Sequence, residues 1–520
     1  MIPPVPSLTQ YLELLSQFDG TLQAAALVGL LIAGVFTLIN FRHLQSLDTA
    51  FPPVNQIRQL VPTMFLALFL RLIRFPESLW YDETFTAAMA ATDISKFPTA
   101  LLGDVHPPLA YLIMRFSALL FGMNEFGLRL PSLVASLLVV WLVWLIANEV
   151  FNSRAAYIAA LLTAVLPGIA YYGAEARYPM LLAAVVLAAL LMILKNKPRW
   201  FAVAIALAPW LHSTGWLYVA VLLTVAIVWH GFRWRWFRSG VLVVILTAPV
   251  AALAYIQTEH VISGFWLQAR APFVHMLTTS LSASLPSGWL QVGGMALVVF
   301  LSAVALVSAL ATGKPLKRAY IYSIAILVPF LAWFVGIVFR PVYLPRTMLA
   351  ATLILVIFWS GWIATLSRRW RSSVLALLIG YSGAAHGYNL YNQLTDNFVR
   401  TDMDNKFFAH CADADVIHTV QLNLAIPAEF YAPDGVDVVS WYSGQNNHQR
   451  LTQNAIRALN IDQVASWTQL TGDVCIVAQY SYYTEENEIE YLTAVADTAE
   501  LVYSENNQLY AYQVYWLYDR

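Results

Sequence analysis

The residues best suited to chemistry lie in two short polar segments of this 520-residue chain. Asp82 and Glu83 follow an apolar run, and Asp104 and His106 precede the stiff dipeptide Pro107-Pro108. Adjacent carboxylates at a membrane surface lose hydration and repel each other, which a nearby cation or a chemical task usually offsets. Asp82 or Glu83 could take a proton from a hydroxyl or hold a divalent cation. The alternatives are two solvated loop acids and, for His106, a purely architectural elbow.

A third polar segment, Glu175-Ala176-Arg177-Tyr178, lies between two apolar runs. We predict that Glu175 faces Asp82 as a second acid and that Arg177 binds a phosphate. Asp82 and Glu175 are also the candidate ligands of a divalent cation such as Mg²⁺ or Mn²⁺. The alternative is an interfacial ion pair between Glu175 and Arg177, because charged side chains at the ends of membrane spans can reach water.

Further cations stand later in the chain. Arg340 and Arg346 flank a proline-rich turn that contains Tyr343, and Arg270 lies in a long aromatic loop at residues 257–289. The alternatives are a lipid-headgroup anchor for the turn and an interfacial amphipathic loop for residues 257–289. The predicted substrate-binding set is Asp104, His106, Arg177, Tyr178, Arg270, Arg340, Tyr343 and Arg346.

Composition determines the class of protein. Hydrophobic residues make up 59% of the chain and charged residues 11%, with a mean hydropathy of +0.62. Soluble domains carry about 25% charged residues, so we predict an α-helical polytopic membrane protein. The net charge of −1 indicates no nucleic-acid partner. About twelve spans are expected, at residues 21–39, 60–74, 128–149, 155–172, 178–194, 200–211, 214–229, 240–256, 290–310, 319–339, 347–366 and 373–388.

Charge in the connecting loops orients these spans. Basic residues gather in four loops, at residues 195–199, 233–238, 314–318 and 368–371. The apolar segment 107–122 is short for a span. If it lies flat on the membrane, every basic loop is cytoplasmic, and if it crosses, every one is external. The positive-inside rule favours the flat arrangement, which places Asp82, Glu175 and Arg346 on one non-cytoplasmic face.

The remainder of the chain divides into three parts. Residues 1–59 hold an extra span and a cytoplasmic loop, residues 60–388 a membrane module with a long first external loop at 75–127, and residues 389–520 a small external α/β domain. Strand patterns occur at 415–422, 436–442, 474–480, 501–503 and 510–517, and helix patterns at 449–459 and 488–496. Cys411 and Cys475 lie in this domain, either as a disulfide or as two buried thiols.

The order of the motifs resembles the C-type (GT-C) membrane glycosyltransferases. The resemblance covers roughly residues 60–366 and is carried by Leu79-Trp80-Tyr81-Asp82-Glu83, His106-Pro107-Pro108-Leu109, Glu175-Ala176-Arg177-Tyr178 and Pro345-Arg346. It is closest to the dolichyl-phosphate-mannose–protein mannosyltransferase-like branch and its bacterial relatives, including the lipid A aminoarabinose transferases. It implies a polyprenyl-phosphate-linked sugar donor, inverting transfer to a lipid, polysaccharide or protein hydroxyl at the plasma (inner) membrane, and Asp82 as base or metal-proximal acid. It suggests Glu175 as the acid of the second external loop.

Three features depart from the family pattern: the span at 21–39, Pro179 directly after Tyr178, and a C-terminal domain that matches nothing we recognise, which leaves the acceptor open. A transporter or flippase for lipid-linked sugars is the main alternative function, and a non-catalytic scaffold is another. Ion-coupled transporters place ionisable residues in mid-membrane, whereas the acids here cluster at the ends of spans. This placement favours an enzyme.

Overall fold

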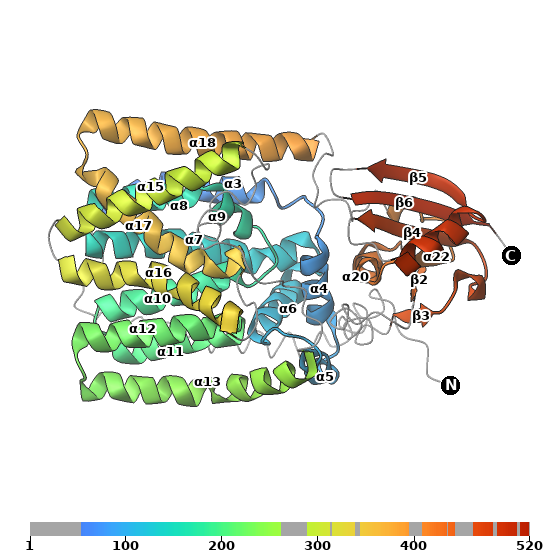
Figure 1. The fold of residues 1–520 in the computed structure, drawn as a ribbon, viewed down its shortest axis with the longest axis horizontal. Helices are drawn as coiled ribbons and strands as arrows, with labels where there is room; N and C mark the ends of the chain where they lie inside the picture. The colour runs from blue at the N-terminus through green and yellow to red at the C-terminus, as the bar shows by residue number, and fades with distance from the viewer. Residues whose placement is uncertain are drawn as a thin grey trace.

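A computed structural model of the chain describes residues 54–261, 289–311, 315–338, 344–394, 408–433, 435–441, 461–481, 486–506 and 510–518. It shows a bundle of apolar helices at one end of the molecule and a sheet domain at the other (Figure 1). Several predicted features lie outside the described residues: the span at 21–39, the helix pattern at 449–459, and Arg270, Arg340 and Tyr343.

Each predicted span from residue 60 onward coincides with a helix of the bundle, and the span at 155–172 is divided where Pro167 cannot continue the helix. Four stretches of the described helices are long and apolar enough to cross a membrane, Glu125–Val150, Trp234–Gln257, Pro315–Gly336 and Pro345–Thr365. The bundle comprises α3 (Val54–Leu72), α7 (Glu125–Val150), α8 (Ser153–Val165), α9 (Pro167–Tyr172), α10 (Pro179–Leu194), α11 (Pro198–Leu211), α12 (Gly215–His230), α13 (Trp234–Val261), α15 (Trp289–Ala311), α16 (Pro315–Val338), the 3₁₀ turn η2 (Pro345–Met348), α17 (Leu349–Thr365) and α18 (Arg368–Leu394).

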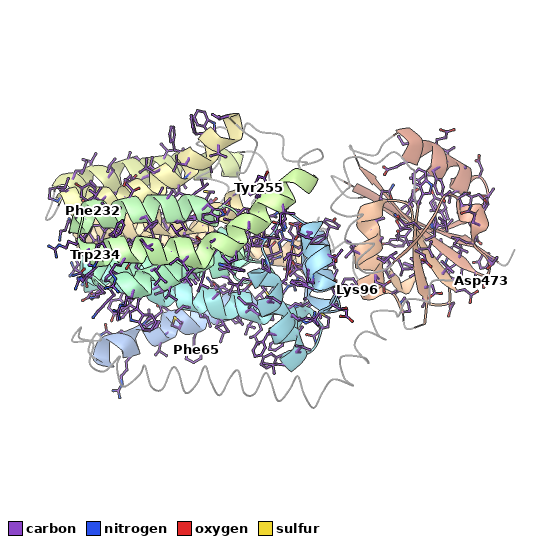
Figure 2. All side chains as sticks on the ribbon, turned by 90° about the horizontal axis from the view of Figure 1, so that it is seen from below. Phe65, Lys96, Phe232, Trp234, Tyr255 and Asp473 are labelled. Carbon is purple, nitrogen blue, oxygen red and sulfur yellow. A yellow bond between two sulfur atoms is a disulfide. The ribbon has the colours of Figure 1, made fainter. Side chains whose placement is uncertain are left out.

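Three short helices, α4 (Tyr81–Ala91), α5 (Phe97–Leu102) and α6 (Leu109–Phe121), lie between the bundle and the sheet domain (Figure 1). Phe85 and Tyr111 of this layer share one apolar cluster with Phe408 and Ile417 of the sheet domain. The helix starts that follow the basic loops lie at the opposite end of the bundle, where Figure 2 labels Trp234. This arrangement fits the prediction that segment 107–122 does not cross the membrane.

The sheet domain has six described strands in the order β3-β2-β1-β4-β6-β5. The first four strands in this order pair in parallel, and β6 pairs antiparallel with both β4 and β5. The strand patterns were predicted correctly except for β3, and α20 was also missed. The elements are β1 (Val416–Thr419), α20 (Leu422–Tyr431), β2 (Asp437–Trp441), β3 (Asp462–Val464), the 3₁₀ turn η4 (Trp467–Gln469), β4 (Val474–Ser481), α22 (Glu486–Ala496), β5 (Glu500–Asn506) and β6 (Tyr510–Leu517).

The sheet domain contacts the membrane module directly. Helix α20 packs on α4, and at its end the Tyr431 hydroxyl accepts the Leu79 backbone N–H at 2.6 Å and donates to Glu125 at 2.8 Å. A disulfide between Cys411 and Cys475 joins the segment before β1 to strand β4, which decides between the two alternatives for these cysteines. The domain therefore supports the turn from which Asp82 projects.

Candidate active site

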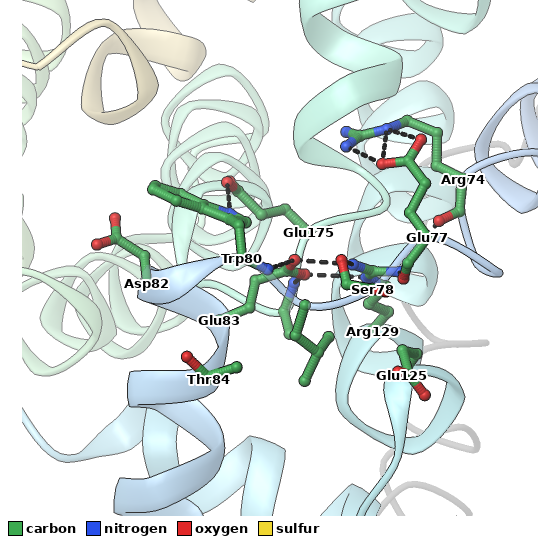
Figure 3. A network of polar contacts seen from close by, with 12 residues as sticks. Arg74, Glu77, Ser78, Trp80, Asp82, Glu83, Thr84, Glu125, Arg129 and Glu175 are labelled. Carbon is green, nitrogen blue, oxygen red and sulfur yellow. Dashed lines mark hydrogen bonds and ion pairs between the residues drawn. The ribbon is translucent and has the colours of Figure 1, made fainter. Parts of the chain in front are cut away.

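The start of helix α4 places two adjacent carboxylates in different surroundings. Trp80 has the extended backbone of a helix-capping residue, and the Glu83 carboxylate reaches back to its N–H at 3.4 Å. Acidic side chains in the first turn are also favoured by the positive end of the helix dipole. Figure 3 shows Asp82 pointing away from the network that holds Glu83.

Glu83 is held in a buried ion pair. The guanidinium of Arg129 on α7 contacts both carboxylate oxygens at 2.9 and 2.8 Å, and the Ala176 backbone N–H donates at 2.6 Å. Burial alone would raise the pKa of Glu83, but Arg129 outweighs it and the pKa is lowered. Arg129 also donates to the backbone carbonyls of Arg74, Phe75, Glu77 and Ser78. This geometry does not suit the predicted catalytic role of Glu83, because its carboxylate is buried and fully engaged.

Asp82 is the more exposed acid, with 20% of its side chain accessible. Its carboxylate contacts the guanidinium of Arg346 at 2.9 Å and that of Arg177 at 3.3 Å. Arg177 also donates to the Asp82 backbone carbonyl at 2.8 Å, and Arg346 lies 5.8 Å from the ring centre of Trp80. Three predicted site residues, from α4, the loop before α10 and η2, therefore meet at one point.

Glu175 lies beside this cluster and is buried. The indole N–H of Trp80 donates to its carboxylate at 2.9 Å (Figure 3). Burial raises the pKa of Glu175 to about 7, although Arg346 opposes the shift. The predicted second acid is thus near Asp82 and titrates close to neutral pH.

Asp104 and His106 form a second polar pair in the loop before α6. The Asp104 carboxylate contacts His106 Nδ1 at 3.1 Å and accepts the Tyr111 hydroxyl at 2.6 Å. Burial alone would raise the pKa of Asp104, but His106 and the hydrogen bonds lower it. Gln257 of α13 donates to the His106 backbone carbonyl at 3.1 Å, so the loop is held from two sides.

The rings of Tyr178 and His212 lie between the Asp82 cluster and the Asp104–His106 pair. They stack with centres 4.0 Å apart, and His106 lies 5.5 Å from His212. Thr214 donates its backbone N–H to His212 Nδ1 at 3.1 Å, which leaves the proton of the neutral imidazole on Nε2. Burial and the neighbouring His106 hold the pKa of His212 well below its ordinary value. Tyr178 packs within the cluster and is itself buried.

A buried arginine supports the segment that carries Glu175. Arg71 on α3 donates to the backbone carbonyls of Thr163 and Ala164, at the end of α8, and to the Ser136 hydroxyl. A Cβ atom at Gly173 would lie 2.5 Å from Ser136 Oγ and 2.8 Å from Arg71 Nε. The backbone at residue 173 can therefore approach Ser136 and Arg71 this closely only because the residue is glycine.

Comparisons with known proteins bear on the fold. The sequence model of the dolichyl-phosphate-mannose-protein mannosyltransferase family matches residues 105–261. Two crystal structures of ArnT from Cupriavidus metallidurans, one bound to undecaprenyl phosphate and one in the apo state, give TM-scores of 0.57 and 0.58. Their identities are 16% and 15%, and each match covers 89% of this chain and 97% of the other. The chain has the GT-C fold.

This assignment confirms the resemblance predicted from the motifs. A structure of the Archaeoglobus fulgidus oligosaccharyltransferase in complex with Zn and sulfate also matches, at 11% identity over 86% of this chain and 72% of that one. Its TM-score is 0.45. No curated protein matches the sequence.

The predicted metal ligands are engaged in other contacts. Asp82 pairs with two guanidiniums, and Glu175 accepts a hydrogen bond from an indole. Within the described ranges, no group of three or more His, Cys, Asp or Glu side chains is placed to hold a metal ion. These residues do not form a preformed cation site, so a role for Mg²⁺ or Mn²⁺ stays a prediction.

Two site residues of the GT-C module were missed from the sequence. Arg129 lies inside a predicted span, where a lone arginine in an apolar run indicates a buried partner. His212 lies in the short polar break between two apolar runs at residues 212–214. That break was interpreted only as a tight hairpin, although histidine there was the available signal.

Proposed function

We propose that the protein is an inverting glycosyltransferase that moves a sugar from a polyprenyl-phosphate donor to a hydroxyl acceptor. The proposal depends on one observation above all. A partly exposed carboxylate, Asp82, is held between two guanidiniums, Arg177 and Arg346. Such a site combines an acid that can accept a proton with cations that can bind a departing phosphate.

The same contacts suggest how donor binding would prepare the acid. Two neighbouring guanidiniums make a carboxylate a weak base. A donor phosphodiester carries one negative charge, like the Asp82 carboxylate, and its oxygens would compete with Asp82 for Arg177 and Arg346; the competition strengthens as the departing phosphate gains a second charge. As these arginines turn to the phosphate, Asp82 regains basicity. Asp82 is therefore the acceptor's base only when the donor is in place.

The transfer step balances without further reactants. The acceptor oxygen forms a bond to the anomeric carbon as the bond from that carbon to the phosphate oxygen breaks. The phosphate leaves with the bonding electron pair and is stabilised by Arg177 and Arg346. The acceptor proton passes to Asp82, and attack opposite the leaving group inverts the anomeric centre.

The remaining site residues position these groups. Glu83 and Arg129 fix the turn before α4, which sets the direction of Asp82. Asp104 orients the His106 imidazole, which is available for phosphate or acceptor. Glu175 holds the Trp80 indole beside Arg346. His212 stacks on Tyr178 and contributes an N–H at Nε2.

The fold and the charge pattern support the chemistry and the location. One structure that shares the GT-C fold is that of ArnT bound to undecaprenyl phosphate, a lipid phosphate of the kind proposed here. The basic loops lie at the end of the bundle opposite the sheet domain (Figure 1). By the positive-inside rule, this supports a location of Asp82 and that domain outside the cytoplasm. The disulfide in the sheet domain agrees with an oxidising compartment outside a plasma (inner) membrane.

The test is direct. Purified protein is incubated with a panel of labelled polyprenyl-phosphate hexoses and pentoses and with lipid, polysaccharide and peptide acceptors, and the products are identified by mass. We expect one donor to give a covalently glycosylated acceptor and free polyprenyl phosphate. Movement of intact lipid-linked sugar across liposomes without a covalent product would instead support a flippase and overturn the proposal.

A further inference from the structure

A second polar site lies at the end of the bundle farthest from Asp82. Between the starts of α11 and α13 the surface holds an open groove of about 1170 Å³. Figure 2 labels Trp234 at this end, opposite the sheet domain. The groove is separate from the reaction site, and the proposed transfer makes no use of it.

Four cations line this basic groove: Lys197, Arg199, Arg235 and Arg238. None of them is ion-paired with a carboxylate in the described part of the chain, whereas Lys195 nearby is paired with Glu149. Arg235 also donates to the Asn196 side chain at 3.2 Å, which ties the two rims together. A concentration of unpaired positive charge in one hollow favours an anion.

The walls of the basic groove are apolar. Val203 and Ile245 face the outer surface of the bundle with 42% and 62% of their areas exposed, and Trp200 and Trp234 lie at the rim. Tryptophan at such a rim is typical of the membrane–water interface. A smaller hollow of about 380 Å³ adjoins the groove along α13 and shares Phe237, Val241 and Ile245 with it. Hydrocarbon chains therefore have two apolar channels along one helix.

We propose that the basic groove binds an anionic membrane phospholipid. The phosphate headgroup lies among the four cations, and the acyl chains run along α13 in the two hollows. The chemistry matches on both counts, because basic pockets between membrane helices attract lipid phosphates and the adjoining surface is apolar. A free phosphate would use only the cations, and a neutral lipid only the walls.

The experiment uses the full-length protein in detergent and native mass spectrometry to count bound lipids. Phosphatidylglycerol and phosphatidylcholine are compared for the wild type, for Arg199→Gln/Arg235→Gln/Arg238→Gln and for Arg368→Gln/Arg369→Gln/Arg371→Gln. The last variant removes the same charge from the same end of the bundle without touching the groove. All three proteins are first shown to unfold at the same temperature.

We expect the wild type to retain phosphatidylglycerol in preference to phosphatidylcholine. The groove variant should bind phosphatidylglycerol at least about tenfold more weakly, and the control variant should bind like the wild type. Equal retention of the two lipids by the wild type would overturn the proposal. So would an equal loss in both variants, since it would indicate general attraction to a basic surface.

Two further arms identify the source of the phosphate. Val203→Trp fills the apolar wall and keeps every cation, so it should weaken phosphatidylglycerol binding. Millimolar inorganic phosphate should not displace the bound lipid. Unchanged binding in Val203→Trp, displacement by inorganic phosphate, or a larger loss of undecaprenyl phosphate than of phosphatidylglycerol in the groove variant would each contradict a phospholipid site.

Discussion

Asp82 and Glu83 are adjacent in sequence and carry the same charge, yet their side chains differ in exposure and in the contacts they make. The Glu83 side chain is 2% exposed, bound on both oxygens by Arg129 and directed into the protein. The Asp82 side chain is 20% exposed and shares two guanidiniums that a phosphate could take over. Because Asp82 is the more exposed of the two, we propose that one helix start supplies a structural acid, Glu83, and a reactive acid, Asp82.

The largest expected effect is the loss of stability when Glu83 is neutralised. Glu83→Gln should lower the free energy of unfolding by about 3–5 kcal/mol, because Arg129 then remains buried without its carboxylate. Thermal unfolding of the purified protein measures this loss. The matched control is Glu149→Gln, which removes a half-exposed ion pair with Lys195 and should cost far less. Equal unfolding temperatures for Glu83→Gln and the wild type would show that the pair is not structural.

The next effect concerns the arginines that contact Asp82 and the binding of the donor. Arg346→Ala should weaken binding of a polyprenyl-phosphate donor about 10- to 100-fold, because a charge-assisted contact to phosphate is lost. Equilibrium binding of a labelled donor measures the effect. Lys96→Ala removes an exposed cation near the same end of the bundle and should leave affinity unchanged (Figure 2). Unaltered affinity in Arg346→Ala would make this arginine purely structural.

The smallest effect concerns Glu175, whose pKa is raised from its usual 4.5 to about 7. Since the folded protein keeps this proton while the unfolded chain loses it, stability should fall as pH rises from about 4.5 to about 7 and then level off. Glu175→Gln should remove that slope and the matching inflection in the activity profile, with activity at pH 7 reduced about tenfold at most. Gln can still accept the Trp80 N–H. An unchanged pH profile would exclude Glu175 as its source.

Much of the membrane module was predictable because long apolar runs determine where helices form. The broken helix after Val165 was signalled by Pro167, yet the run on both sides concealed it. Asp82, Arg177 and Arg346 could be assigned to one face, since loop charge indicates which ends of the helices share a side. Their contact distances could not be predicted from charge.

Two kinds of information were absent from the sequence. The partner of Glu83 lies on α7, and only the packing of α4 against neighbouring helices brings Arg129 to it. The second kind of missing information is the order of the strands. Parallel pairing of β1 with both β2 and β4 depends on crossovers rather than on local patterns. Periodicity identifies elements, whereas neighbours come from tertiary packing.

The central claim is that Asp82 serves the reaction while its two arginines serve the donor. The most direct test measures donor binding and single-turnover transfer for Asp82→Asn in the same preparation. We predict transfer at least about a hundredfold slower, with donor affinity equal to or higher than in the wild type, because the competing carboxylate is gone. Transfer at the wild-type rate would contradict the account.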